Sequence, residues 1–204
     1  KLADLVLVAG SPHERIADLY KVERVWLGGV EQSREPVRGE GATQLAKVQV
    51  QELLDDFESA GGRSRISTLW VNRTDYSHDH SEMIYQRVAS DKGGHAFHIS
   101  TQLGEKDKPM AAMVLPLSKG AVQPADLSGY GWLEFDARGE GEYRFDLERP
   151  GMGARMSPFT AGPKWGKVRI GLGDSEATAM VFIIERAAGE KAWLEIDNLR
   201  LVRR

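Results

Sequence analysis

Charged side chains alternate with apolar ones along two consecutive stretches of the sequence. In the first stretch the charged residues are Glu134 and Asp136, and in the second they are Arg144 and Asp146. Successive side chains of a β-strand point to opposite faces of its sheet, so each stretch buries one face and exposes the charged one. If the two strands are neighbours, they present a single charged face of mixed sign. This pattern predicts a binding surface for a polar ligand.

His98 is a candidate for the same surface. It lies in a predicted strand, opposite Phe97 and Ile99, and so faces the side that carries polar groups. An ordinary surface histidine is the simpler alternative. Four tryptophans could stack on sugar rings, as aromatic side chains do in many carbohydrate sites, with core packing as the more common use of such residues; they are Trp70, Trp132, Trp165 and Trp193.

Other patterns give little evidence for catalysis. His78 and His80 could face one side of a strand and bind a metal, but the polar segment around them is typical of a solvated loop. The sequence contains no cysteine and no Gly-x-Ser-x-Gly nucleophile elbow. We therefore expect no catalytic residue in this chain.

Composition narrows the range of functions. The chain has 204 residues, of which 41% are hydrophobic and 28% charged, with a net charge of −3. Without a basic excess, a nucleic-acid partner is not expected. No apolar run approaches the ~20 residues that span a membrane as a helix. The chain begins with Lys1 and shows no signal-peptide pattern, which indicates a piece of a longer protein.

The apolar pattern divides the chain into three regions. Residues 1–32 read as a β fragment, with strands expected near 3–8, 22–27 and 30–32 and one or two helical turns within 13–20. Residues 33–50, rich in Pro, Gly and polar residues, are predicted to form a linker. Residues 51–204 contain evenly spaced, strand-like runs without a sustained helical period. That arrangement predicts an all-β sandwich or jelly roll; its clearest strands are 95–101, 110–117, 132–137, 142–148, 167–172, 180–185 and 193–202.

The first region resembles the C-terminal tail of the amidohydrolase superfamily, in its imidazolonepropionase and prolidase-like branch. The resemblance rests on the run Lys1–Val8, on Gly10-Ser11-Pro12, on Ile16–Leu19 and on Val22–Val30. It implies that this stretch closes a small β-sandwich, which packs beside a metal-bearing barrel lying outside this chain. It carries over no catalytic residue, because that family's metal ligands lie on the barrel.

The third region resembles the complex I intermediate-associated family, a galactose-binding-like jelly roll that is also similar to some carbohydrate-binding modules. The matching segments, in order, are Leu54–Glu58, Pro124–Tyr130, Glu134–Gly139, Pro158–Gly162 with Trp165, and Leu194–Leu199. In jelly rolls of this kind the first and last strands lie side by side. The resemblance therefore implies that Asp56, Glu58 and Asp197 could hold a structural calcium ion, the alternative being that they cap strand ends.

These observations lead to one main hypothesis and two alternatives. We expect a non-catalytic accessory domain that binds or scaffolds a partner at the C-terminus of an amidohydrolase-like protein. The first alternative is a carbohydrate-binding module, and the second is an assembly chaperone of the complex I type. The expected partners are the barrel of the parent chain, a glycan or a protein. The compartment depends on the parent: periplasmic or secreted if it carries a signal peptide, and cytoplasmic otherwise.

Overall fold

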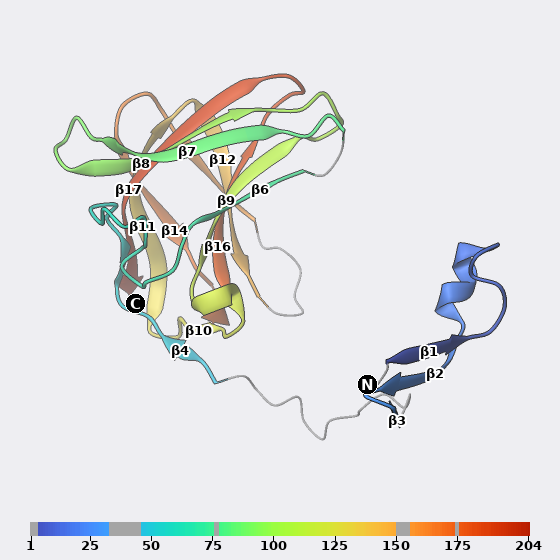
Figure 1. Cartoon of the computed structure of the whole chain (residues 1–204). Coiled ribbons are helices and arrows are strands. Elements are labelled where there is room, and N and C mark those ends of the chain that lie inside the picture. The colour runs from blue at the N-terminus through green and yellow to red at the C-terminus, as the bar shows by residue number, and fades with distance from the viewer. Residues whose placement is uncertain (1–3, 33–45, 76–77, 150–155, 174–175) are drawn as a thin grey trace. The chain divides into compact units, whose positions relative to one another are not determined.

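The computed structural model of the chain describes residues 4–32, 46–75, 78–149, 156–173 and 176–204. The chain divides into two compact units, Lys1–Gln44 and Leu45–Arg204. We call the first the small unit and the second the sandwich, and describe each by itself (Figure 1).

The small unit is an antiparallel sheet of three strands. β1 (Leu5–Val8), β2 (Val22–Leu27) and β3 (Val30–Glu31) lie in that order, and the 3-10 helix η1 (Ile16–Tyr20) connects the first two. The predicted strands and helical turns are confirmed. Gly28 and Gly29 have φ values of 57° and 80°, the left-handed backbone that a tight two-residue hairpin requires.

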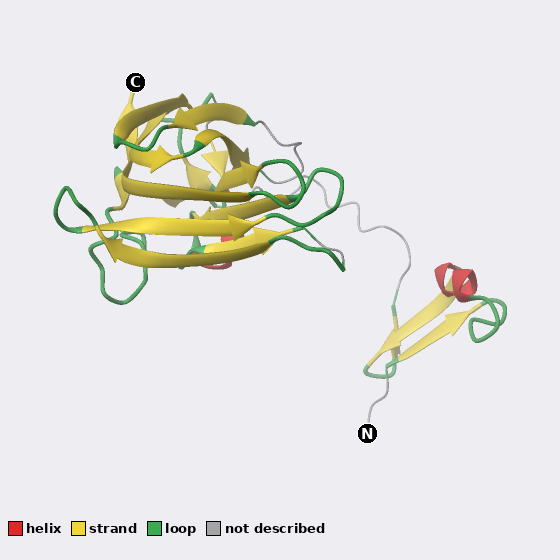
Figure 2. Ribbon diagram, turned by 90° about the horizontal axis from the view of Figure 1, so that it is seen from above, coloured by secondary structure: helices red, strands yellow, loops and turns green. Residues whose placement is uncertain are grey.

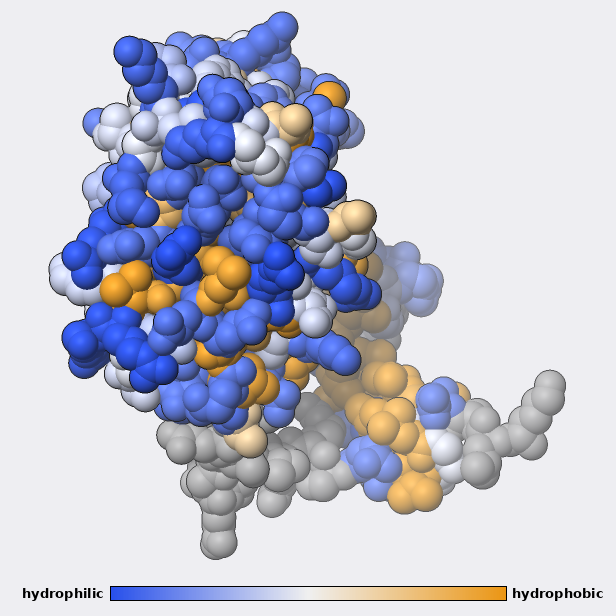
Figure 3. Space-filling model, turned by 90° about the vertical axis from the view of Figure 1, so that its left-hand side faces the viewer, coloured by the Kyte–Doolittle hydropathy of each residue, from blue (hydrophilic) through white to orange (hydrophobic). Residues whose placement is uncertain are grey.

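Both faces of this small sheet carry exposed apolar side chains. Leu5 and Val6 follow one another in β1 and so point to opposite faces, yet they are 59% and 57% exposed. Val30 in β3 is 64% exposed, and hydrophobic residues gather on the small unit in Figure 3. A sheet of this size has too little chain to form a core of its own.

The sandwich consists of two antiparallel sheets packed face to face, as the view from above shows (Figure 2). The first sheet has the order β14-β11-β17-β8-β7, with β5 also paired to β17, and the second has the order β13-β12-β16-β9-β6. The strands of the first sheet are β5 (Leu53–Asp55), β7 (Glu82–Ala89), β8 (His95–Gln102), β11 (Tyr130–Gly139), β14 (Gly166–Gly171) and β17 (Lys191–Arg203). Those of the second are β6 (Val71–Thr74), β9 (Met110–Pro116), β12 (Gly141–Glu148), β13 (Ser157–Ala161) and β16 (Ala179–Glu185).

A third, small sheet closes one end. Its strands are β4 (Val48–Gln49), β10 (Ala125–Asp126) and β15 (Glu176–Ala177), and the 3-10 helix η2 (Lys119–Ala121) precedes β10. β10 pairs with β4 in parallel and with β15 antiparallel. All seven strands predicted most clearly from the sequence are present, and the all-β jelly-roll prediction is confirmed.

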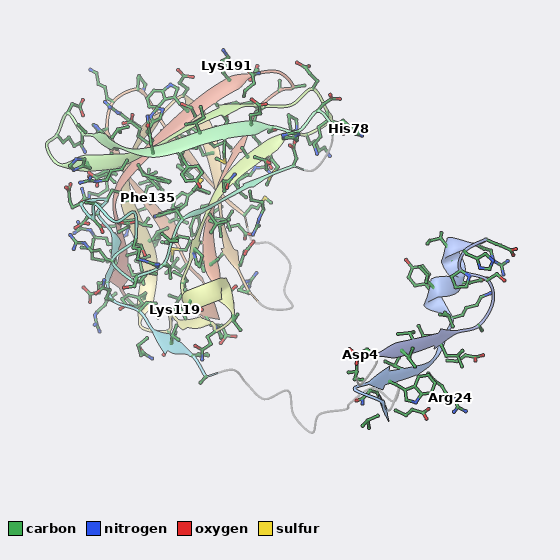
Figure 4. All side chains as sticks on the ribbon, in the orientation of Figure 1. Asp4, Arg24, His78, Lys119, Phe135 and Lys191 are labelled. Carbon is green, nitrogen blue, oxygen red and sulfur yellow. The ribbon has the colours of Figure 1, made fainter. Side chains whose placement is uncertain are left out.

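Aromatic rings from both sheets form the centre of the core. Phe135 of the first sheet meets Phe159 and Phe182 of the second edge to face, each with ring centroids 5.3 Å apart. Phe145 packs on Phe182 at 5.4 Å. Figure 4 places Phe135 between the two layers. These contacts follow from the alternation in the sequence, because the inward residue of each pair is the apolar one.

A short turn carries the chain from the first sheet to the second between β11 and β12. A Cβ on Gly139 would lie 2.4 Å from Tyr143 Oη and 2.9 Å from the Trp193 carbonyl oxygen, so only glycine fits there. Gly141 has a φ of 97°, which also favours glycine. Tyr143 Oη accepts a hydrogen bond from the Glu140 N–H at 2.7 Å and donates to the Trp193 carbonyl at 2.5 Å. The turn is thus tied to β17.

The predicted linker reaches too far into the sandwich. Residues 33–45 of the predicted 33–50 lie outside the described residues. Strand β4, however, falls within the same range and pairs with β10. Lys47 Nζ lies 2.6 Å from Glu176 Oε2 of β15. The sandwich therefore begins before Gln51. The sequence did not reveal this, because a strand of two residues is too short to show an alternating pattern. Within the described residues, no helix has the length and apolar character needed to span a membrane.

This boundary can be tested by truncation. We expect a chain of residues 45–204 to unfold in one transition at the Tm of the full chain, because the core lies wholly within it. A chain of residues 51–204 loses Val48 and Val50, which pack against the core. It should be less stable by about 1–3 kcal/mol, measured by thermal and urea unfolding. Equal stability of the two fragments would place the boundary at Gln51 after all.

Candidate functional site

The predicted charged face is divided between opposite sides of the sandwich. Glu134 and Asp136 lie on β11, which pairs with β14 and β17 in the first sheet. Arg144 and Asp146 lie on β12, which pairs with β13 and β16 in the second. The prediction of one shared face was wrong, because alternation assigns a side chain to a face of its own sheet and does not show which sheet that is.

The outer face of the second sheet has an apolar floor. On β9 and β16 the inward residues join the core, and the outward residues are also apolar. These outward side chains are Ala112, Val114, Ala179, Val181 and Ile183, and all are buried. A strand that is apolar on both sides is typical of a position covered on both sides. We call this surface, together with the charged residues that surround it, the concave face.

One ion pair shows that the face is curved. Arg73 Nη1 of β6 lies 2.5 Å from Glu148 Oε1 of β12, although β9 and β16 separate their strands. Strands lie about 4.8 Å apart, so β6 and β12 of a flat sheet would be about 14 Å apart. The two residues are also offset by four positions along β16. The side chains meet only because the sheet curls toward this side, and their bridge crosses above Val114 and Val181.

A second ion pair lies on the same face and remains open to solvent. Arg144 Nη1 is 3.1 Å from Glu185 Oε2, and the two side chains are 51% and 37% exposed. Two shallow hollows, of 370 and 430 Å3, adjoin the pair, and both are lined by Arg144, Glu185 and Arg186. Glu142 and Pro158 line the first hollow as well.

The groups around these hollows suit a ligand rich in hydroxyls. A guanidinium offers several donors in a fixed plane, and a carboxylate only accepts, so together they match groups that both donate and accept. Arg186 is held in place by the Glu140 carbonyl at 2.8 Å and stacks over Tyr143 at 4.8 Å. Asp146 shares this face but is only 7% exposed, so Arg144 is the more accessible of the two predicted residues.

The outer face of the first sheet is a network of ion pairs. Glu134 pairs with Arg169 at 3.2 Å, and that guanidinium lies 4.5 Å above the ring of Trp132. Asp136 lies 3.4 Å from Lys92 and 3.7 Å from Lys167. These predicted ligand-binding residues are therefore engaged by neighbours on their own surface.

His98 belongs to a hydrogen-bonded chain on this first sheet. Its Nε2 is 2.7 Å from Ser100 Oγ and its Nδ1 is 2.9 Å from Glu195 Oε1, the order of groups found in serine hydrolases. Glu195 is also bound to Arg138 at 2.6 Å. β8 pairs with β7 and β17 on its two sides, so the backbone N–H groups near Ser100 bond to neighbouring strands and do not form an oxyanion hole. We interpret this chain as a structural link across the sheet.

The four tryptophans divide between the core and the outer side of the first sheet. Trp70 packs against Phe97 and Phe182 in the core, as the core alternative predicts. Trp132 is 41% exposed, the Trp165 ring lies 4.8 Å from Lys92 Nζ and 4.9 Å from Arg138 Cζ, and Trp193 stacks on His98. Core packing is therefore wrong for these three, which lie on the outer side of the first sheet.

Two of the three predicted calcium ligands, Asp56 and Glu58, are engaged by other partners. Both carboxylate oxygens of Asp56 bond to Arg65, at 2.8 and 2.7 Å, which keeps the pKa of Asp56 below its usual value. Glu58 accepts from the His95 ring and backbone nitrogens at 2.8 and 2.7 Å, and its pKa is lowered as well. Among the described residues, no three His, Asp or Glu side chains form a group that could hold a metal. Asp56 does not fit a calcium site in this arrangement.

Asp197 stands apart from the other acids. It is 6% exposed, and its neighbours Asp136 and Glu58 are also acidic. Burial, with a smaller contribution from these charges, raises the pKa of Asp197 to about 6. The Asn198 backbone N–H, donated at 2.7 Å, offsets part of the cost.

Sequence reasoning missed Arg73, Glu185 and Arg186. The last two directly follow the apolar run of β16, a signal that could have marked the end of a strand beside a site. Arg73 lies in a polar segment with no clear alternation, so its pairing with Glu148 could be found only from the fold. Asp75, next to the predicted histidine pair, accepts from the Ser81 backbone N–H at 2.6 Å.

Comparison with known proteins identifies the fold. No family model matches the chain, and no curated protein matches it. Solved structures do. A family 11 carbohydrate-binding module from Clostridium thermocellum, in complex with a beta-1,3-1,4-mixed-linked tetrasaccharide, has a TM-score of 0.55 at 17% identity and covers 74% of this chain and 95% of its own. A family 11 module of a cellulosomal cellulase of the same organism has a TM-score of 0.56 at 16% identity, covering 78% and 97%.

A larger protein contains a similar part. An exo-beta-agarase has a TM-score of 0.50 at 12% identity, with 76% of this chain matched to 26% of that one. At such identities the likeness shows the fold alone: an all-β jelly-roll sandwich like that of the matched carbohydrate-binding modules. The resemblances to the complex I family and to the amidohydrolase tail stay predictions.

Asp197 predicts a pH dependence of stability. In the folded chain it keeps its proton up to about pH 6, whereas in the unfolded chain it releases it near pH ~4. The stability that protonation contributes is therefore lost as the pH rises from about 4 to 6. We expect Asp197→Asn to be more stable than the native chain at pH 7, by about 1–3 kcal/mol, and to lose this pH dependence. Urea unfolding of both chains at several pH values measures this difference in stability.

The exposed Asp107→Asn serves as the matched control and should leave the profile unchanged. The calcium prediction is tested in the same experiment. If an ion binds at Asp197, calcium added after EDTA treatment will raise the native Tm at pH 7 and will have no effect on Asp197→Asn. If the difference in stability between the native chain and Asp197→Asn stays constant from pH 4 to 6, the buried, protonated state is contradicted.

Proposed function

We propose that the sandwich is a non-catalytic glycan-binding module and that its ligand lies on the concave face. The observation that carries the proposal is the solvent-open Arg144–Glu185 pair between two hollows on a curved sheet. A concave surface can contact an extended polymer along its length, and the paired charges can bond to hydroxyl groups.

The fold supports this choice over the other binding roles. Two of the matched structures are carbohydrate-binding modules, and one of them is described with a bound tetrasaccharide. A glycan ligand also suits a face whose charges are balanced, because neutral sugars need donors and acceptors in similar number. The scaffolding and assembly-chaperone alternatives predict a protein partner instead.

Mutation of the concave face tests the proposal. We expect Arg144→Ala to weaken glycan binding at least tenfold, since losing charge-assisted hydrogen bonds costs about 1.5–3 kcal/mol. Arg169→Ala is the matched control: its guanidinium is 50% exposed and pairs with Glu134 at 3.2 Å on the opposite side. A glycan array would identify the ligand, and native gels containing soluble polysaccharides would compare the variants.

Two results would contradict this function. One is a folded native chain that binds no glycan on the array and is not retarded by any polysaccharide. The other is an equal loss of binding in both variants. Specific capture of a protein that Arg144→Ala no longer captures would favour scaffolding.

We further propose that the small unit completes a small β-sandwich in the parent protein, as its amidohydrolase resemblance implies. The observation that favours this role is the exposure of apolar side chains on both faces of the small sheet. A three-stranded sheet of this kind is stabilised by packing on other strands.

Dye binding tests the exposed faces. We expect the full chain to enhance ANS fluorescence more than a chain of residues 45–204, because the dye binds exposed apolar surface. The parent's preceding domain, added as a separate polypeptide, should suppress the difference. If the two chains bind the dye equally from the start, the faces of the small unit are already covered and the proposal fails.

A further inference from the structure

An aromatic pocket opens at the edge of the sandwich, away from the concave face. The segment between β5 and β6 crosses beside β7, the last strand of the first sheet, and encloses a volume of 360 Å3. Phe57, Trp70, Tyr85 and Phe97 supply its aromatic lining. None of the four appears among the residues that line the Arg144 hollows.

The aromatic rings form one continuous surface. Phe57 stacks on Phe97 with centroids 5.2 Å apart and planes 8° from parallel. Trp70 and Tyr85 also contact Phe97, at 5.1 and 5.9 Å. Tyr85 is 39% exposed, so this surface extends from the core to solvent. Such a lining suits the flat or C–H-rich face of a ring.

A buried carboxylate holds the lining in position. Asp55 is 3% exposed; its Oδ1 accepts from the Phe57 N–H at 2.9 Å and its Oδ2 from Trp70 Nε1 at 2.8 Å. Phe57 has a φ of 54°, a conformation that a bulky side chain rarely adopts. Arg87 Nε donates to the Phe57 carbonyl at 2.5 Å from the other side. The unfavourable conformation is maintained by specific bonds, as is common where a site is preorganised.

The mouth of the pocket carries an unbalanced positive charge. Arg63 and Arg87 both line it, but Arg87 lies 3.7 Å from Glu58. Arg63 donates to the Ser67 carbonyl at 3.0 Å, and no described carboxylate lies within ion-pair distance of it. The acid that lines the pocket, Asp55, is already engaged by Phe57 and Trp70. A ligand with a negative group would therefore find its counter-charge at Arg63.

We infer that this pocket binds a sugar ring that carries a carboxylate, that is, a uronate residue. The ring face packs on the aromatic lining and the carboxylate pairs with the Arg63 guanidinium. The choice of a sugar rests on the proposed glycan-binding function, whereas the choice of an anion rests on Arg63. The sandwich then has two binding sites on different sheets, one for the hydroxyl groups of a glycan chain and one for a uronate residue.

Two probes that differ in one group test this inference. Methyl β-glucuronide has a carboxylate where methyl β-glucoside has a hydroxymethyl group. On the full chain, we expect the glucuronide to shift the NMR signal of the Trp70 indole N–H, assigned by its loss in Trp70→Phe, and to bind at least fivefold more tightly than the glucoside at low salt. The preference should shrink at high salt, because it arises from one exposed charge.

Variants separate this site from the concave face. Arg63→Gln should remove the preference for the glucuronide, Arg63→Lys should retain part of it, and Arg169→Gln should change nothing. Arg144→Ala should leave the Trp70 shift intact even if glycan binding on the concave face is lost or never observed. Equal binding of both glycosides would overturn the anionic ligand. Benzoate that shifts Trp70 where the glucuronide does not would overturn the sugar.

Discussion

The turn between β11 and β12 decides where every candidate residue lies. Gly139 leaves no room for a side chain beside Tyr143, and the hydrogen bonds of Tyr143 tie this turn to β17. Because the chain changes sheets here, residues that alternate in the same phase on both strands end on opposite outer faces. The charges of β11 enter the ion-pair network of the first sheet, and Arg144 is left to the concave face. A side chain at position 139 would clash with Tyr143 of β12 and with the Trp193 carbonyl of β17.

Curvature explains the unusual composition of the second sheet. β9 and β16 are apolar on both faces, which a flat, solvated sheet would not favour. The curl brings Arg73 and Glu148 together over these strands, so Val114 and Val181 are shielded although they lie outside the core. The ion pair is partly exposed, and such pairs contribute little stability by themselves. Its importance is geometric, because it bridges one part of the face and leaves the Arg144–Glu185 part open.

The two proposed sites differ in how their charges are balanced. On the concave face, guanidinium and carboxylate groups pair with one another and stay accessible, which suits neutral hydroxyls. At the edge pocket the acid is buried and satisfied, and the remaining cation faces outward. The same fold thus offers two kinds of polar recognition, one by matched donors and acceptors and one by charge. Asp55 and Asp197 are both buried acids, but their surroundings differ. Asp55 accepts hydrogen bonds from its aromatic neighbours, whereas Asp197 lies close to other acids.

The sequence alone determined the fold class, the seven clearest strands and the inward residue of each, because the alternation of apolar and polar side chains is a local property of a strand. It also placed Arg144 on an outer face. Only the tertiary structure decided which strands share a sheet, and so separated Glu134 and Asp136 from Arg144. Three tryptophans that could have packed in the core lie on the outer side, and Asp56 is engaged by Arg65, a residue nine positions away. Pairing, curvature and long-range ion pairs depend on contacts between distant segments, which one-dimensional periodicity does not encode.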